Sequence, residues 1–152
     1  MDINLQPKKD YNPHMHTTEH VLNQTMVRMF NCGRSFNAHI ESKKSKCDYR
    51  LQRDLTEDEV IQIEEKVNEI LSSNLDVTEE FYTFEEAQKL FDLSKLPNDA
   101  GSKIRVIKVG DYDACPCRGV HVTNTKEVST FKIVSHNFTG EFLRIRFKLI
   151  TE

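Results

Sequence analysis

Two pairs of side chains that commonly bind metal ions lie near opposite ends of this 152-residue chain, and both pairs have the same spacing. His16 and His20 are four positions apart, and Cys117 and His121 repeat that separation almost a hundred residues later. Residues four apart on an α-helix share one face, so the first pair can reach a single ion. Imidazole and thiolate together suit tetrahedral zinc. If both pairs hold one zinc ion, the fold must bring an early helix against a late loop.

These residues also fit roles that involve no metal ion. A chain with six histidines can carry one such pair by accident, as two solvated histidines on a helix. His14 would point away from His16 on a shared helix, so we expect it to be exposed. Cys115 precedes Cys117 by two positions, and a Cys-Pro-Cys turn could direct either thiolate inward. The four-residue spacing to His121 favours Cys117.

Composition limits the classes of protein to which the chain can belong. Its length predicts one domain over residues 1–152, and its net charge of −3 argues against tight, non-specific nucleic-acid binding. No apolar run is long enough to cross a bilayer, and the N-terminus lacks the apolar core of a signal peptide. We therefore expect a cytoplasmic protein with no membrane partner, and nothing in the sequence indicates an obligate protein partner. In that compartment we expect thiols or metal ligands, with Cys32 and Cys47 as packing residues.

Apolar residues at helical spacing predict three helices. The first covers residues 14–30 and ends at residues 31–33. A Thr-x-x-Glu capping box at residues 56–59 opens the second, and another at residues 83–86 opens a third that ends near Phe91. The buried face of the second helix is predicted to carry Val60, Ile63, Val67 and Ile70.

Alternating apolar and polar residues predict strands in the rest of the chain. The predicted strands cover residues 46–51, 104–109, 130–135 and 142–150, with a loop at residues 111–121. Residues 1–13 are interpreted as a short strand or a lead-in. The predicted fold class is α+β, with helices packed on a mostly antiparallel sheet and the zinc site between the early helix and the late loop.

The motifs around the two pairs resemble those of one protein family. His16-Thr-Thr-Glu-His20-Val-Leu is similar to the HxxxH helix of the editing domain of alanyl-tRNA synthetases. Residues 113–128, which include Cys117-Arg-Gly-Val-His121-Val, resemble that family's second motif, in which Cys-Gly-Gly-Thr-His-Val leads into Thr-x-Glu. The capped helix and the strand before it resemble the elements between the two motifs. The resemblance covers almost the whole chain and is to the free-standing AlaX-type proteins, which consist of the editing domain alone.

This resemblance implies a hydrolase that acts in trans on mischarged tRNA. The family cleaves the ester that joins serine, or sometimes glycine, to the terminal adenosine of alanine tRNA. The related second additional domain of threonyl-tRNA synthetases removes serine similarly. Zinc is the family's cofactor, held at the positions that match His16, His20, Cys117 and His121. Four protein ligands would fill a tetrahedral site, so the zinc is structural, expands its coordination, or exchanges one ligand for substrate. We favour a zinc that contacts the substrate.

A pocket that distinguishes serine from alanine needs a polar group for the serine hydroxyl. The segment after the first helix falls where the family has polar pocket residues. Asn37 is our choice for this contact, with Ser35 and His39 as substitutes, and each could equally be an ordinary turn residue. Asp113 and Glu127 are candidates for catalysis or for fixing a ligand histidine.

The loop around the second pair departs from the family motif at two positions. Arg118 replaces the first glycine, and Val120 replaces the threonine. We expect Arg118 to bind substrate because its charge suits the end of a nucleic acid, although a solvated loop arginine fits the sequence equally well. Loss of the threonine hydroxyl could alter how the substrate amino acid is hydrogen-bonded.

Two basic clusters are candidates for contacts with tRNA. Lys43, Lys44 and Lys46 follow the predicted pocket segment, and Arg144 and Arg146 line the outer face of the last strand. Exposed basic side chains are more often simply solvated, and the net charge of −3 predicts weak, strongly salt-dependent binding.

Two other functions fit the same residues. The chain could be a zinc-stabilised module that binds RNA or a protein without catalysis. It could also be a zinc hydrolase of another small ester or amide.

Overall fold

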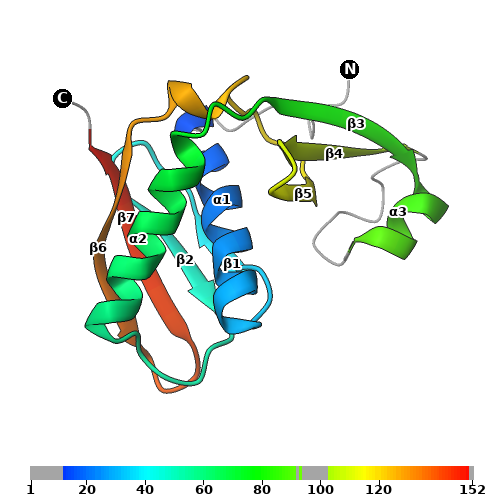
Figure 1. The fold of residues 1–152 in the computed structure, drawn as a ribbon. Coiled ribbons are helices and arrows are strands. Elements are labelled where there is room, and N and C mark those ends of the chain that lie inside the picture. Colours follow the sequence, from blue (N-terminus) through cyan, green and yellow to red (C-terminus); the bar gives the residue numbers. More distant parts are fainter. Residues whose placement is uncertain (1–11, 92, 94–102, 151–152) are drawn as a thin grey trace.

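Two antiparallel sheets carry the strands of this α+β chain, whose computed structural model describes residues 12–91, 93 and 103–150 (Figure 1). The first sheet has four strands in the order β1 (Asn37–His39), β2 (Ser45–Tyr49), β7 (Leu143–Ile150), β6 (Thr130–Phe138). The second has three, in the order β3 (Val77–Thr83), β4 (Lys103–Val109), β5 (Asp113–Pro116). The α+β class is confirmed, with two antiparallel sheets in place of the single sheet expected.

The first helix, α1 (Pro13–Phe30), begins one residue before its predicted start. The Asn12 side chain accepts a hydrogen bond from the backbone N–H of Met15 at 3.1 Å, which satisfies one of the free donors at the helix start. Pro13 fits this first turn because its missing N–H would have had no partner inside the helix. Asn31 ends the helix in the left-handed conformation, with φ of 53°.

The main core lies between two helices and the four-stranded sheet. Figure 1 shows α1 and α2 (Glu57–Leu71) over one face of that sheet. Both predicted capping boxes form, at the starts of α2 and of α3 (Phe84–Leu90). Ile63, Val67 and Ile70 are buried as predicted, and Val60 is half-buried. From the sheet, the core receives Cys47, Tyr49, Phe131, Ile133, Leu143, Ile145 and Phe147.

Three strands were missing from the sequence-based expectation. β3 is largely exposed on both faces, so it carries no apolar alternation that could reveal it. β1 has three residues, all exposed. β5 occupies part of the segment predicted as a loop, which is a correction to that prediction. Residues 1–11 of the predicted lead-in lie outside the described part of the chain.

The second sheet extends sideways from the core and carries α3 at its far end (Figure 1). Its strand β4 is mostly buried, as predicted for residues 104–109. β5 packs against α1 and delivers the chain to the segment that holds Cys117. Among the described residues, no helix combines the length and the apolar character needed to span a membrane.

Candidate metal centre

The fold brings the two distant pairs together at one point between α1 and the loop after β5. His16 and His20 lie on the same face of α1, and Cys117 directly follows β5. One ligand atom from each of His16, His20, Cys117 and His121 lies within 4.8 Å of all the others. The expected meeting of an early helix with a late loop is therefore confirmed.

The two distances from the Cys117 sulfur to its histidine neighbours fit a tetrahedral ion. Zinc–nitrogen and zinc–sulfur bonds of ordinary length place neighbouring ligand atoms about 3.3 to 3.6 Å apart. The Cys117 sulfur lies 3.3 Å from Nε2 of His16 and 3.5 Å from Nε2 of His121. Three imidazoles and one thiol are also donors that zinc prefers. The residues present fit zinc, and their role as its ligands stays a prediction.

Backbone contacts hold the loop in the shape that presents Cys117. The Arg105 guanidinium, from β4, donates from Nη1 to the carbonyl oxygens of Cys117 and Gly119 at 3.0 and 2.8 Å. The backbone N–H of Gly119 donates to the Cys117 sulfur at 3.3 Å. This contact fixes the position of the sulfur relative to the loop backbone.

Thr17 links α1 to the second half of the group. Its hydroxyl oxygen lies 3.0 Å from Nδ1 of His121 and accepts a hydrogen bond from the backbone N–H of Val122 at 3.2 Å. A hydrogen bond at Nδ1 leaves Nε2 of His121 directed at the sulfur of Cys117. Thr17 therefore fixes the orientation that a ligand histidine needs.

Asp113 lies behind His20 and is itself held by an arginine and an amide. Its Oδ2 is 3.6 Å from Nδ1 of His20, while Arg34 donates to both carboxylate oxygens at 2.6 and 3.2 Å. Gln24 donates to Oδ1 at 2.9 Å. Burial favours a neutral Asp113, but His20 and Arg34 outweigh it and hold the pKa of the carboxyl below its usual range. This is the arrangement expected of a residue that fixes a ligand histidine, one of the two roles predicted for Asp113.

The histidines of the group have opposite pKa shifts. Burial, followed by the charge of His20, lowers the pKa of His16 far below 6.5 and that of His121 to about 2. Burial acts in the same direction on His20, but the neighbouring carboxylate of Asp113, followed by the sulfur of Cys117, outweighs it and raises the pKa of His20 well above 6.5. His16 and His121 are therefore neutral, the form in which imidazole binds metal, and His20 holds a proton that a metal ion would displace.

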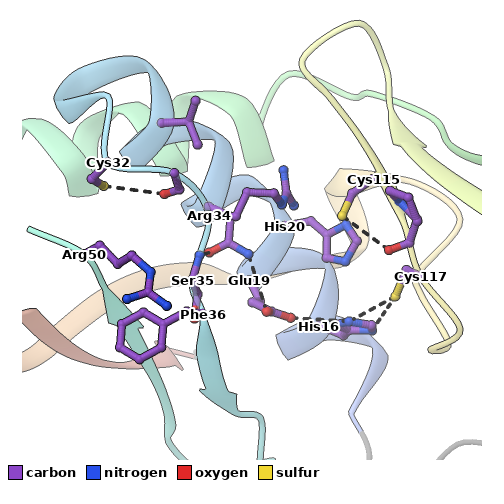
Figure 2. Close-up of a pocket in the computed structure, with 14 residues that line it drawn as sticks. His16, Glu19, His20, Cys32, Arg34, Ser35, Phe36, Arg50, Cys115 and Cys117 are labelled. Carbon is purple, nitrogen blue, oxygen red and sulfur yellow. Dashed lines mark hydrogen bonds and ion pairs between the residues drawn. The ribbon is translucent and has the colours of Figure 1, made fainter. Parts of the chain in front are cut away.

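A cavity of about 600 Å³ opens beside the metal-ligand candidates. Figure 2 shows His16, His20 and Cys117 at one side of it and Phe36 and Arg50 at the other. Glu19, Asn23, Arg34, Ser35 and Cys115 also line the cavity. The metal-ligand candidates therefore lie beside a cavity large enough for a small ligand.

The predicted substrate-binding residues have different positions relative to this cavity. Ser35 lines it, and its hydroxyl donates to the carbonyl of Asn37 at 2.8 Å. Asn37 lies on β1, where its side chain donates to Asp48 at 3.1 Å and does not line the cavity. His39 is exposed beside Glu41, and Arg118 follows Cys117 outside the cavity lining.

Glu127 and the basic candidates have local partners. Glu127 accepts hydrogen bonds from Thr123 and Asn124 and caps the short 3₁₀ helix η2 (Thr125–Glu127), which is a structural role. Arg144 donates to the buried carboxylate of Asp48, and Arg146 to Ser135 and Asn137. Lys43 and Lys44 are exposed, and Lys46 is half-buried.

Of the two competing ligand candidates, His14 is exposed as predicted, and Cys115 faces the cavity. The Cys115 sulfur lies 3.4 Å from the carbonyl of Pro116. All four cysteines are free thiols. Cys47 is fully buried in the core, and the partly buried Cys32 packs against that core. Both are packing residues, as predicted.

Sequence reasoning missed three residues that shape the site: Thr17, Arg34 and Arg105. Thr17 had a readable signal, because it lies between the two histidines of one motif. Arg34 and Arg105 gave no such signal in the sequence, because their partners are distant. Asp113 lies 79 residues after Arg34, and Cys117 and Gly119 lie 12 and 14 residues after Arg105.

Comparison with known proteins connects this site to a family. Residues 104–144 match the family model of the threonyl and alanyl tRNA synthetase second additional domain. Similar proteins include the alanine–tRNA ligases of Thermoanaerobacter pseudethanolicus, Fervidobacterium nodosum and Leptospira biflexa, at 32%, 31% and 33% identity. The matches cover 85%, 90% and 82% of this chain and 15%, 16% and 14% of those proteins.

The chain thus spans about a seventh of the length of the relatives that it matches. The matched family segment begins in β4 and ends in β7, and it includes Cys117 and His121. The relatives' similarity extends over most of the remaining chain. The resemblance inferred from the motifs is confirmed: this chain is similar to alanine–tRNA ligases over most of its length, and its residues 104–144 match the threonyl and alanyl tRNA synthetase second additional domain.

Proposed function

We propose that this chain is a zinc-dependent hydrolase that deacylates mischarged tRNA. Its substrate would be alanine tRNA that wrongly carries serine or glycine. The protein would cleave the ester that joins the amino acid to the tRNA. One observation carries the proposal: a group of three histidines and one cysteine borders a cavity in a chain related to alanine–tRNA ligases. Because such a substrate belongs to translation, the protein would act in the cytoplasm.

Zinc held by His16, His20, Cys117 and His121 would polarise the ester carbonyl or acidify a water molecule. The chain's own residues prepare the site for this role. Gly119 donates to the sulfur of Cys117, and Thr17 orients His121. Four protein donors fill a tetrahedral site, so contact with substrate would require a fifth position or the release of one donor.

The cavity supports recognition of a small aminoacyl group. Of the proposed hydroxyl contacts, Ser35 is the one that lines the cavity, and a serine hydroxyl can donate one hydrogen bond and accept others. We therefore propose Ser35 as the residue that meets the hydroxyl of the substrate serine. A site with a waiting polar group rejects an alanyl ester more strongly than an apolar pocket could.

Contacts with the tRNA would come from exposed lysines. Lys43 and Lys44 have no acidic partner among the contacts of the described residues and lie in the turn between β1 and β2. Arg144 is the weaker candidate because its guanidinium is engaged by Asp48. With a net charge of −3, affinity should fall steeply as salt rises.

The test is release of amino acid from purified seryl-, glycyl- and alanyl-tRNA for alanine, with and without a chelator. We expect hydrolysis of the first two and protection of alanyl-tRNA, with activity lost on chelation and restored by zinc. Binding of tRNA without release of amino acid would instead favour a binding module. Hydrolysis of small esters without hydrolysis of charged tRNA would favour a different zinc hydrolase.

A further inference from the structure

Glu19 places a carboxylate at the edge of the metal site. It lies on α1 three positions after His16 and directly before His20, so it is adjacent to the face that carries both histidines. Its side chain is 13% exposed and lines the cavity. Figure 2 shows it beside His16, on the side from which the cavity extends toward Phe36 and Arg50.

The surroundings of Glu19 leave its negative charge available to a ligand. Its Oε1 is 3.3 Å from Nε2 of His16, and its Oε2 accepts a long hydrogen bond of 3.4 Å from Asn23. As a metal ligand His16 would be a neutral imidazole, and Asn23 is neutral, so neither side chain carries a positive charge opposite Glu19. Arg34 also lines the cavity and attracts Glu19 electrostatically, but its guanidinium nitrogens donate hydrogen bonds to both oxygens of Asp113. Among the described residues that line the cavity, Glu19 is the acidic one.

An aminoacyl ester carries one positive group, the α-ammonium, one carbon away from the ester carbonyl. An ester that presents its carbonyl to the metal-ligand candidates would therefore bring its ammonium within a few ångströms of the same point. A carboxylate beside the metal site supplies the opposite charge and accepts the ammonium's hydrogen bonds. A buried position strengthens this attraction because solvent screens it less.

We propose that Glu19 binds the α-ammonium group of the aminoacyl ester and makes the enzyme selective for esters that carry a free amino group. This rests on the proposed deacylase function. Asn23 holds the carboxylate through Oε2, and the ammonium donates its hydrogen bonds to the carboxylate from the cavity side.

The experiment compares two esters on the same tRNA. One is seryl-tRNA, and the other is its α-hydroxy analogue, made by deaminating seryl-tRNA with nitrous acid. Wild-type protein should prefer the seryl ester in kcat/KM. Glu19→Gln keeps the shape and removes the charge, so it should slow hydrolysis of the seryl ester roughly 10- to 100-fold, the loss typical of a charge-assisted hydrogen bond. The α-hydroxy ester should change by less than about threefold, and Glu19→Asp should recover part of the preference.

Matched controls separate this role from others. Glu65→Gln removes the same charge from the exposed face of α2 and should change neither rate. Zinc content and thermal stability of Glu19→Gln should equal those of the wild type. Equal slowing of both esters would assign Glu19 to a step common to both and overturn the proposal, as would loss of zinc. If wild-type protein hydrolyses neither ester, the deacylase function itself is wrong and the role of Glu19 falls with it.

Discussion

The hydroxyl of Thr17 and Nδ1 of His121 lie 3.0 Å apart, although 104 residues separate them in the chain. The contact joins α1 to the loop after β5 and lets the same oxygen accept the N–H of Val122. One threonine thus connects both halves of the metal-ligand group.

Replacement of Thr17 by valine should weaken zinc binding about 10- to 100-fold, because His121 loses the partner that fixes its orientation. Competition with a chromophoric chelator measures this change. Thr18→Val is the matched control, since the Thr18 hydroxyl donates to the carbonyl of His14 within the same helix, at 2.7 Å. Equal effects of the two changes would show that Thr17 matters only to the helix.

Cys117→Ala should abolish stoichiometric zinc binding and deacylation, because the group loses its thiolate. Cys115→Ala should retain both, since the Cys115 sulfur lies outside the four-residue group. Metal analysis of the two purified variants, with activity on seryl-tRNA, checks the assignment. Retention of zinc by Cys117→Ala together with its loss from Cys115→Ala would reverse it.

The stability of the zinc-free chain should peak near pH 6.5, the ordinary pKa of histidine. Below that value unfolded His16 and His121 take up protons, while burial keeps their pKa low in the folded chain. Stability therefore falls with falling pH, by up to about 1.4 kcal/mol per pH unit for each histidine. Above that value the folded chain retains the proton on His20, whose pKa is raised, and the unfolded chain has released it. Its contribution is therefore lost as pH rises through the folded pKa.

Urea denaturation between about pH 5 and 8 with a chelator present measures this profile. His121→Asn should flatten the acid side of the profile, because one depressed pKa is gone. His39→Gln should leave the profile unchanged, as His39 is exposed on the surface. A profile of the wild type that is flat over this range would contradict the opposing shifts.

Arg144→Met should destabilise the fold by about 2 kcal/mol, because it leaves the carboxylate of Asp48 buried without its cation. Asp48 is fully buried and accepts from Arg144 at 2.9 and 3.1 Å. Urea denaturation gives the free energy of unfolding, and Arg146→Met, which breaks hydrogen bonds only to polar neutral side chains, serves as the control. If Asp48→Asn does not recover stability in the Arg144→Met chain, the unpaired charge is not the cause.

Local signals in the sequence predicted the helices and the metal-ligand group. Capping boxes and the spacing of the two pairs each involve residues within about one turn, so they can be read without knowing the fold. The direction of the Asn37 side chain could not be predicted from local sequence signals. Its side chain turns toward Asp48 because β1 pairs with β2, and that pairing depends on residues eleven positions away.

Glu127 is a different case, because its signal was present in the sequence. Asn124 and Glu127 have the spacing of a capping box, and the structure uses them as one. Because Glu127 lies close to the metal motif, it was also a candidate for catalysis or for fixing a ligand histidine, and this stays a prediction. The role of Arg105 could not be predicted from the sequence. Its hydrogen bonds to the carbonyls of Cys117 and Gly119 depend on the pairing of β4 with β5.

The meeting of α1 with the loop after β5 also sets an order of events during synthesis. The donors on α1 leave the ribosome almost a hundred residues before Cys117. A nascent chain therefore offers at most two of the four donors until late in translation, and the long segment between the two pairs contains the whole second sheet. Metal loading then requires a chain in which the second sheet, β3-β4-β5, has been synthesised, and chains truncated before Cys117 would carry only two of the four donors.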